Sequence, residues 1–133
     1  MAQQIHFELV SPERLLLSEH VEMVVVPGSE GDFGVLADHA PMLSTIRPGV
    51  LAVYHKGRVV ERIFVAGGFA EVTETTLTVL AEEAIVVDSL ERAEVERRLA
   101  LAQEALQIAD TPVLRTEAEN RLAVIEAMLV ALQ

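Results

Sequence analysis

Hydrophobic and polar residues alternate along the first part of the chain, a pattern that predicts β-strands. Ile5, Phe7 and Leu9 alternate with His6 and Glu8, the period of a half-buried strand. Many short strands with frequent turn signals, and no helical pattern between them, predict an all-β sandwich or flattened barrel. Besides the strand at 5–9, the expected strands are residues 21–26, 50–54, 59–65, 69–72, 77–80 and 84–87.

The hydrophobic period changes to that of helices after residue 88. Asp88 is expected to cap a first helix, with Glu91 completing a capping box. Thr111 and Pro112 are a good N-cap and first position for a second helix. About one residue separates the two helical patterns, so an antiparallel hairpin is expected. The apolar stripes are Val95, Leu99, Ala102, Leu106 and Ala109, then Leu114, Ala118, Leu122, Ile125, Leu129 and Leu132.

Glycine and proline are distributed unevenly, which predicts two domains. All seven glycines lie at or before Gly68, and residues 89–133 contain nine alanines and one proline. Since glycine and proline mark turns and alanine favours helix, the boundary is expected near Asp88. The predicted domains are a β-sandwich at 1–88 and a helical hairpin at 89–133.

The charge balance excludes several partners. Ten Lys and Arg residues against twenty-one Asp and Glu residues leave a net charge of −11. This argues against nucleic acid and against direct binding to, or insertion into, lipid. The absence of cysteine excludes disulfide scaffolds, zinc ribbons and thiol catalysis. No membrane span or signal peptide is recognised, so a soluble intracellular protein is expected.

The residues suggest no catalytic centre. His6, His20, His39 and His55 are scattered without metal-ligand spacing, and structural roles are expected for all four. The chain has no phosphate-binding glycine loop and no nucleophile elbow. We therefore expect neither an enzyme nor a metal or cofactor site.

The segment at 27–49, PGSEGDFGVLADHAPMLSTIRPG, is unusually rich in glycine and proline. Gly28, Gly31 and Gly34 allow a tight path, and Glu30 and Asp32 are expected on an exposed loop tip. The segment is either a structured connection between strands or a docking loop.

Residues 27–49, together with 66–72, 77–81 and 7–12, resemble the epsilon subunit of F-type ATP synthases (delta in mitochondria). The resemblance covers the whole chain. It implies a non-catalytic central-stalk subunit that couples proton-driven rotation of the c-subunit ring to ATP synthesis in the catalytic head. The implied partners are the gamma subunit and the c ring, with the alpha/beta head reached by an extended hairpin. The implied place is the cytoplasmic face of the bacterial inner membrane, as a peripheral protein.

The resemblance also carries over individual residues. Glu30, Gly31 and Asp32 match the loop that faces the c ring. His39, Met42 and Leu43 match the segment that faces gamma.

In many bacteria of this family the hairpin regulates ATP hydrolysis, and in some it binds ATP. Asp88, Arg92 and Arg121 are the residues here that would contact a nucleotide. The match departs from the ATP-binding pattern, because Glu117 stands four residues before Arg121 where an arginine is expected. From Thr111 onward, two arginines face three glutamates, a net of −1, which predicts weak inhibition. The alternative hypothesis is a hairpin adaptor or chaperone-like binding module.

Overall fold

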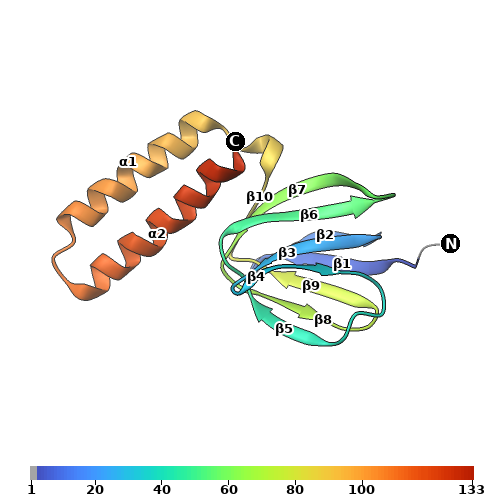
Figure 1. Cartoon of the computed structure of the whole chain (residues 1–133). Helices are drawn as coiled ribbons and strands as arrows, with labels where there is room; N and C mark the ends of the chain where they lie inside the picture. Colours follow the sequence, from blue (N-terminus) through green and yellow to red (C-terminus); the bar gives the residue numbers. More distant parts are fainter. Residues whose placement is uncertain (1–2) are drawn as a thin grey trace. The chain divides into compact units, whose positions relative to one another are not determined.

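The computed structural model describes residues 3–133, which fold into two compact units. The first unit extends to Val86 and consists of β-strands, and the second, Val87–Gln133, is helical. Figure 1 shows the strands of the first unit as two layers and the two helices of the second as a hairpin. The predicted sandwich followed by a helical hairpin is confirmed.

The sandwich contains two five-stranded sheets. In sheet 1 the order is β2 (Leu15–Val21), β1 (Ile5–Val10), β9 (Thr76–Leu80), β8 (Phe69–Val72) and β5 (Met42–Thr45). In sheet 2 it is β10 (Glu83–Val86), β7 (Arg58–Ala66), β6 (Gly49–His55), β3 (Met23–Gly28) and β4 (Gly31–Val35). Neighbouring strands are antiparallel except for the parallel pair β1 and β9.

The alternating residues of the two sheets form the core between them. Ile5 and Phe7 are fully buried on β1, and their neighbour His6 lies on the solvent side. Leu77 and Val79 of β9 are also fully buried, as are Leu51 and Val53 of β6. The period of two read from the sequence therefore identifies the core face, because successive side chains of a strand point to opposite sides of its sheet.

Three strands were not expected from the sequence: β2, β4 and β5. Val21, expected to start a strand, ends β2, and β3 begins at Met23. In β2 the alternation is broken by a register shift, where Leu9 pairs with Leu17 but Val10 pairs with Leu15. β4 and β5 are short edge strands within 27–49. This segment is therefore not a loop but a strand at the edge of each sheet, joined by residues 36–41.

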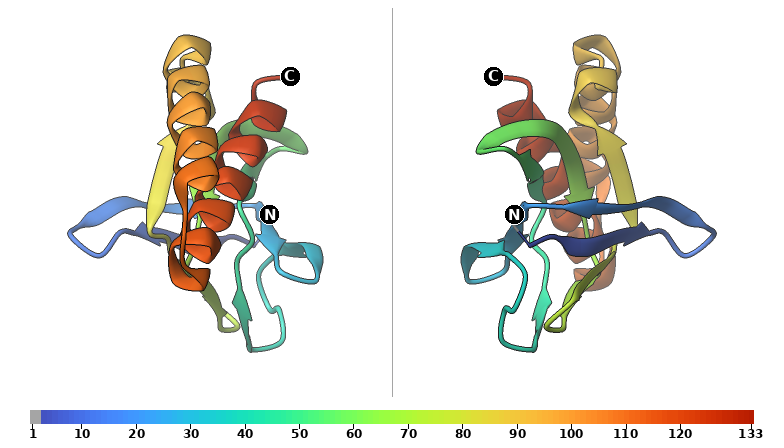
Figure 2. Two further views of the ribbon diagram at one scale, coloured as in Figure 1. Left: turned by 90° about the vertical axis from the view of Figure 1, so that its left-hand side faces the viewer. Right: turned by 90° about the vertical axis from the view of Figure 1, so that its right-hand side faces the viewer.

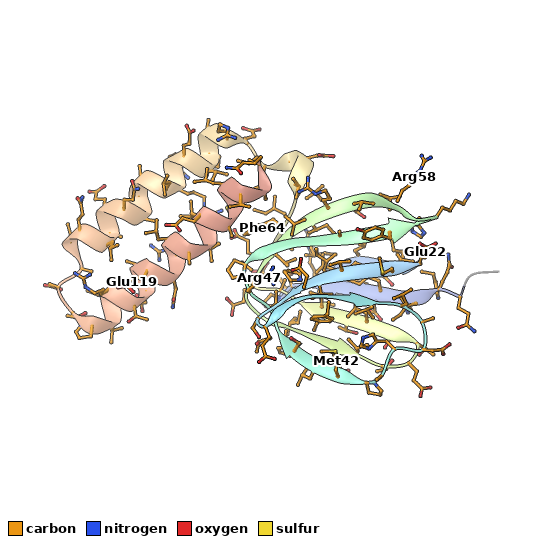
Figure 3. The ribbon with its side chains drawn as sticks, in the orientation of Figure 1. Glu22, Met42, Arg47, Arg58, Phe64 and Glu119 are labelled. Carbon is orange, nitrogen blue, oxygen red and sulfur yellow. The ribbon has the colours of Figure 1, made fainter. Side chains whose placement is uncertain are left out.

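The hairpin of β6 and β7 turns at Lys56 and Gly57, both with positive φ, 53° and 75°. Such values are typical of the tight turns that match strand twist. Glu22, the residue before β3, holds this turn. Its carboxylate accepts hydrogen bonds from the backbone amides of Lys56 at 3.1 Å and Gly57 at 3.0 Å. Glu22 is labelled beside this turn in Figure 3.

The expected start of the first helix is wrong. Asp88 lies in a 3₁₀ turn (Val87–Ser89), and the helix α1 (Arg92–Ile108) begins four residues later. Glu91 is the N-cap residue and makes no side-chain capping bond. The Leu90 amide donates to the Val87 carbonyl at 3.0 Å, so the backbone closes a separate turn before the helix can begin.

The second helix, α2 (Pro112–Ala131), starts as predicted. The Thr111 hydroxyl accepts the Leu114 amide at 3.1 Å, and Pro112 occupies the first turn. The two helices lie side by side in both views of Figure 2. On the predicted stripes Val95, Ala102, Ala118 and Ile125 are buried, but Leu114 is 47% exposed.

One carboxylate lies on the core side of the sandwich. Ile63 and Val65 of β7 are buried in the core, so Glu61 projects from the same face, opposite the fully buried Val53. It lines a cavity of about 190 Å³ at the open edge of the sandwich. Burial raises the pKa of Glu61, and the negative charge of Glu19 raises it further.

Candidate docking surfaces

Glu30 lies at the tip of the turn between β3 and β4 and is exposed. Gly28 and Gly31 flank this turn as register partners. A Cβ at Gly28 would lie 2.7 Å from the Gly31 carbonyl oxygen and 2.8 Å from the Phe33 ring. Gly31 has a φ of 133°, which side chains rarely adopt. The two glycines therefore make this turn tight enough to present Glu30 at its end.

Residues 45–47, at the end of β5 and the start of the connection to β6, stabilise this turn by hydrogen bonds. The Arg47 guanidinium donates from Nη1 to the Gly28 carbonyl and from Nη2 to Asp32, each at 2.6 Å. The Ser29 amide donates to the Thr45 carbonyl at 3.0 Å, and the Thr45 hydroxyl donates to Ser29 Oγ at 2.7 Å. Contacts from 45–47 thus brace the turn although they lie far from it along the chain. Arg47 is labelled in Figure 3.

The ion pair changes the charge of this surface. Asp32 pairs with Arg47, whereas within residues 3–133 no ion pair is formed by Glu30. The unpaired negative charge of the turn is therefore on Glu30. The sequence reasoning grouped Glu30 and Asp32 as equivalent and did not identify Arg47.

The structure divides the other expected site, His39, Met42 and Leu43. His39 lies in the 36–41 connection, half-buried, with Nδ1 2.7 Å from the Ala40 carbonyl oxygen. Met42 pairs with the buried Val72 and lies on the core side of β5, at the edge. Leu43 pairs with the exposed Glu71 on the outer side and is 67% exposed. The three residues do not share one face.

Leu43 instead adjoins an apolar row on the outer face of sheet 1. Register pairs connect Leu15 to Val10, Val10 to Leu80, Leu80 to Phe69, and Phe69 to Thr45. Leu43 lies two residues before Thr45, on the same side of β5. Leu15 is 53% and Phe69 41% exposed. We call the five apolar members the outer patch: Leu15, Val10, Leu80, Phe69 and Leu43.

Sequence reasoning missed most of the outer patch. Leu80 and Phe69 belong to predicted strands and alternate with buried residues, which was the available signal for an outward direction. Their assembly into one row requires strand pairing, which no local pattern supplies.

The cavity that Arg121 lines includes neither Asp88 nor Arg92. Arg121 lines a cavity of about 300 Å³ near the helix–helix turn, with Ala105 and Ile108 of α1. Arg92 is thirteen residues before Ala105, about 20 Å along the helix axis at 1.5 Å per residue. Asp88 precedes α1 altogether. Glu117 lines the same cavity as Arg121, and its negative charge would repel a phosphate there.

Two further features of the described residues bear on function. Residues 3–133 contain no helix of the length and hydropathy needed to cross a membrane. In the same part of the chain no group of three or more potential metal ligands is placed to hold an ion.

Comparison with known proteins covers almost the whole chain. Residues 4–87 match the family "ATP synthase, Delta/Epsilon chain, beta-sandwich domain". The ATP synthase epsilon chain of Rhodospirillum rubrum is 56% identical over 98% of each chain, and that of Paramagnetospirillum magneticum is 53% identical over the same share.

Solved structures agree on the fold. A chain in the mitochondrial ATP synthase of Euglena gracilis matches 98% of this chain and 82% of its own length, with a TM-score of 0.83 and 26% identity. One in the central stalk and c-ring structure of the Tetrahymena thermophila mitochondrial ATP synthase has a TM-score of 0.75 at 15% identity, a likeness of fold.

The family match over the sandwich and the near full-length identity to bacterial epsilon chains identify the same family. They decide between the two hypotheses and disfavour a free adaptor or chaperone-like module. The chain belongs to the epsilon-chain family of F-type ATP synthases, as a non-catalytic central-stalk subunit of the complex that couples proton transport to ATP synthesis.

Proposed function

We propose that the sandwich, residues 1–88, binds the gamma subunit through the outer patch of sheet 1. The observation that carries this is the apolar row across the sheet, which includes Leu43 of the expected gamma-facing segment. Contiguous exposed apolar surface is typical of protein interfaces. Leu43 and Phe69 are the most exposed apolar side chains at the β5 end of the row and are the anchors of this contact. His39 lies in the 36–41 connection and Met42 lies on the opposite side of β5 from Leu43, so neither is an anchor of this contact.

We further propose that the turn carrying Glu30 and Gly31 faces the c ring. The tip is tight and braced by Arg47, so it presents a negative charge in a defined place. The polar loops of a c ring can offer basic residues to such a charge. Asp32 supports the turn through Arg47 and contributes less charge to the contact.

Binding of the chain to an alpha–beta–gamma complex that lacks this subunit tests the first proposal. Leu43→Asp and Phe69→Asp should each weaken binding by at least tenfold, because a carboxylate would be desolvated in an apolar contact. Val60→Asp is the matched control, since Val60 is 56% exposed on β7 in the other sheet. The proposal is wrong if both sheet 1 variants bind as well as Val60→Asp does.

ATP-driven proton pumping by the reconstituted synthase tests the c-ring proposal. Glu30→Lys should reduce pumping more than ATP hydrolysis, because it reverses the charge at the contact with the ring. Asp32→Asn should have the smaller effect. Equal pumping with Glu30→Lys and the wild-type chain would remove the assignment of this turn to the c ring.

We infer that the hairpin, residues 89–133, is a regulatory arm that inhibits ATP hydrolysis weakly when it extends to the alpha/beta head. The last eight residues carry one glutamate and no cation, so an acidic surface would not attract them. The cavity lined by Arg121 includes Glu117 but neither Asp88 nor Arg92, which argues against nucleotide binding by Asp88, Arg92 and Arg121 together. The relatives are bacterial, which supports a location at the cytoplasmic face of the inner membrane, held by the complex.

A further inference from the structure

Two histidines form a stacked pair on the outer face of sheet 1. His6 of β1 and His20 of β2 are register partners, with ring centroids 4.8 Å apart and ring planes 14° from parallel. The two residues lie fourteen positions apart in the sequence, and only strand pairing brings them together. Neither belongs to the core: His6 is half-buried and His20 is exposed.

His6 and His20 face each other at the shorter of the two distances between opposite α-carbons that antiparallel strands allow. The His6 amide donates to the Thr75 carbonyl at 3.0 Å, and it therefore points toward β9 and away from β2. His6 and His20 thus form a pair without mutual backbone hydrogen bonds, in which the α-carbons are only about 4.5 Å apart. Two imidazoles at this spacing can reach a common point above the sheet by side-chain rotation alone.

The neighbouring side chains are polar. His6 Nε2 lies 2.8 Å from Ser18 Oγ, a hydrogen bond that holds the ring over β2. Ser18 pairs with Glu8, so a carboxylate stands in the adjacent row of the same face. On the other side, His6 pairs with Thr76 of β9. The surroundings of the pair are accessible to water and carry negative charge, as does the chain as a whole, which favours a cation.

Imidazole nitrogen is a strong ligand for divalent transition metals, and two imidazoles on one rigid support bind better than either alone. We propose that His6 and His20 form a two-histidine site for a divalent transition-metal ion. Water completes the coordination, and Cu²⁺ is held more tightly than Zn²⁺, as the usual order of affinities requires. The site is open, so it binds more weakly than a closed four-ligand zinc site.

Calorimetric titration of the metal-free full chain with Cu²⁺ and with Zn²⁺, in a buffer that does not bind metals, tests this site. One equivalent of each ion should bind, with Cu²⁺ the tighter. His6→Gln and His20→Gln should each lower the affinity at least tenfold, because either change leaves one imidazole. His39→Gln and His55→Gln are matched controls and should bind like the wild-type chain.

A second readout locates the ion independently of affinity. Paramagnetic Cu²⁺ should broaden the amide signals of Phe7 and Glu19, next to the two histidines, before those of the hairpin. Unchanged affinity in His6→Gln and His20→Gln, for example because the terminal amine binds the ion, would overturn the proposal. Broadening of the amide signals next to His39 or His55, in place of those of Phe7 and Glu19, would also overturn it. Amide spectra of each metal-free variant show whether the sandwich is still folded. If His6→Gln is unfolded, His20→Gln, which changes an exposed residue, still tests the site.

Discussion

The guanidinium of Arg47 joins Asp32 and the backbone of the Glu30 turn in one contact. Its Nη2 lies 2.6 Å from an Asp32 carboxylate oxygen, and its Nη1 lies 2.6 Å from the Gly28 carbonyl oxygen. The two acidic residues of the turn are thereby made unequal, because only Asp32 is paired. Of the two acidic residues of the turn, only Glu30 therefore presents an unpaired negative charge.

Replacing Arg47 should loosen the turn more than replacing Asp32. Both side chains of the ion pair are about half exposed, 43% and 58%, so Asp32→Asn should cost at most about 1 kcal/mol. Arg47→Met also removes the bond to the Gly28 carbonyl and should cost about 1–3 kcal/mol. Urea unfolding gives the two values, and amide exchange at Glu30 and Gly31 should accelerate only in Arg47→Met. Equal losses in both variants would mean that the ion pair, and not the bond to the backbone, holds the turn.

Gly68 should tolerate no side chain. It has a φ of 90°, and a Cβ there would lie 1.7 Å from the Leu80 carbonyl oxygen, a backbone atom that pairs β8 with β9. Gly57 has a similar φ of 75°, but a Cβ there meets nothing within 4 Å. Gly57→Ala should therefore cost about 1–2 kcal/mol from backbone strain alone, and Gly68→Ala clearly more. Thermal unfolding compares them, and a smaller loss in Gly68→Ala would contradict the close approach of the two strands.

Ala102 should be the position where the hairpin least accepts a larger residue. Its side chain is fully buried, and Ala118 on the other helix is 4% exposed. Ala102→Leu should destabilise the hairpin by about 1–3 kcal/mol, because a longer side chain forces α1 and α2 apart. Ala100→Leu, at an exposed position of the same helix, is the control and should be nearly neutral. Limited proteolysis of residues 89–133 reports the opening, and equal resistance of the two variants would refute it.

Glu61 should destabilise the sandwich at neutral pH but not at acid pH, where its carboxyl group is protonated in both states. Its pKa is raised above 4.5 by burial and by Glu19, so the folded state holds a proton that the unfolded state has released. Stability from this group therefore falls as the pH rises from 4.5 through the raised pKa, and the full cost is present above it. Glu61→Gln should thus be more stable than the wild-type chain at neutral pH.

The advantage of Glu61→Gln should shrink as the pH falls through the raised pKa toward 4.5 and should disappear well below 4.5, where Glu61 is protonated in both states. Urea unfolding at neutral pH and at about pH 4 measures this difference. Glu13→Gln, at an exposed position of the sandwich, is the control. A Glu61→Gln variant that is less stable than the wild type at neutral pH would show that the carboxylate is needed in its charged form.

Removing the hairpin should release little ATP hydrolysis. A chain ending after Asp88 should raise hydrolysis by the assembled synthase less than tenfold, which corresponds to under about 1.4 kcal/mol of binding free energy. The physical reason is the absence of cations in the last eight residues. Adding two arginines, with Ala127→Arg and Val130→Arg, should strengthen inhibition if charge is the limiting factor. A large increase on truncation would show that the hairpin grips the head by apolar contact.

Local patterns in the sequence were sufficient for the fold class. The alternation at Ile5, Phe7 and Leu9 identifies a strand and its buried face, and the Thr111–Pro112 start identifies α2, because each depends only on neighbouring residues. The same patterns gave a wrong start for the first helix, because an additional backbone turn at Asp88 precedes α1. They also did not predict the short edge strands within 27–49, a segment rich in glycine and proline. The family resemblance then supplied the function, which no catalytic pattern in the chain could.

Only the tertiary structure decided which residues act together. The outer patch joins Leu15 to Leu43 across five strands, Arg47 reaches Asp32 fifteen residues away, and His6 meets His20. It also placed Met42 and Leu43 on opposite sides of β5, and it placed Arg121 in a cavity that Arg92 does not line. These relationships depend on strand register and helix packing, which are set by contacts between distant segments. The periodicity of the sequence determines which side of an element is buried, and only folding determines what lies beside it.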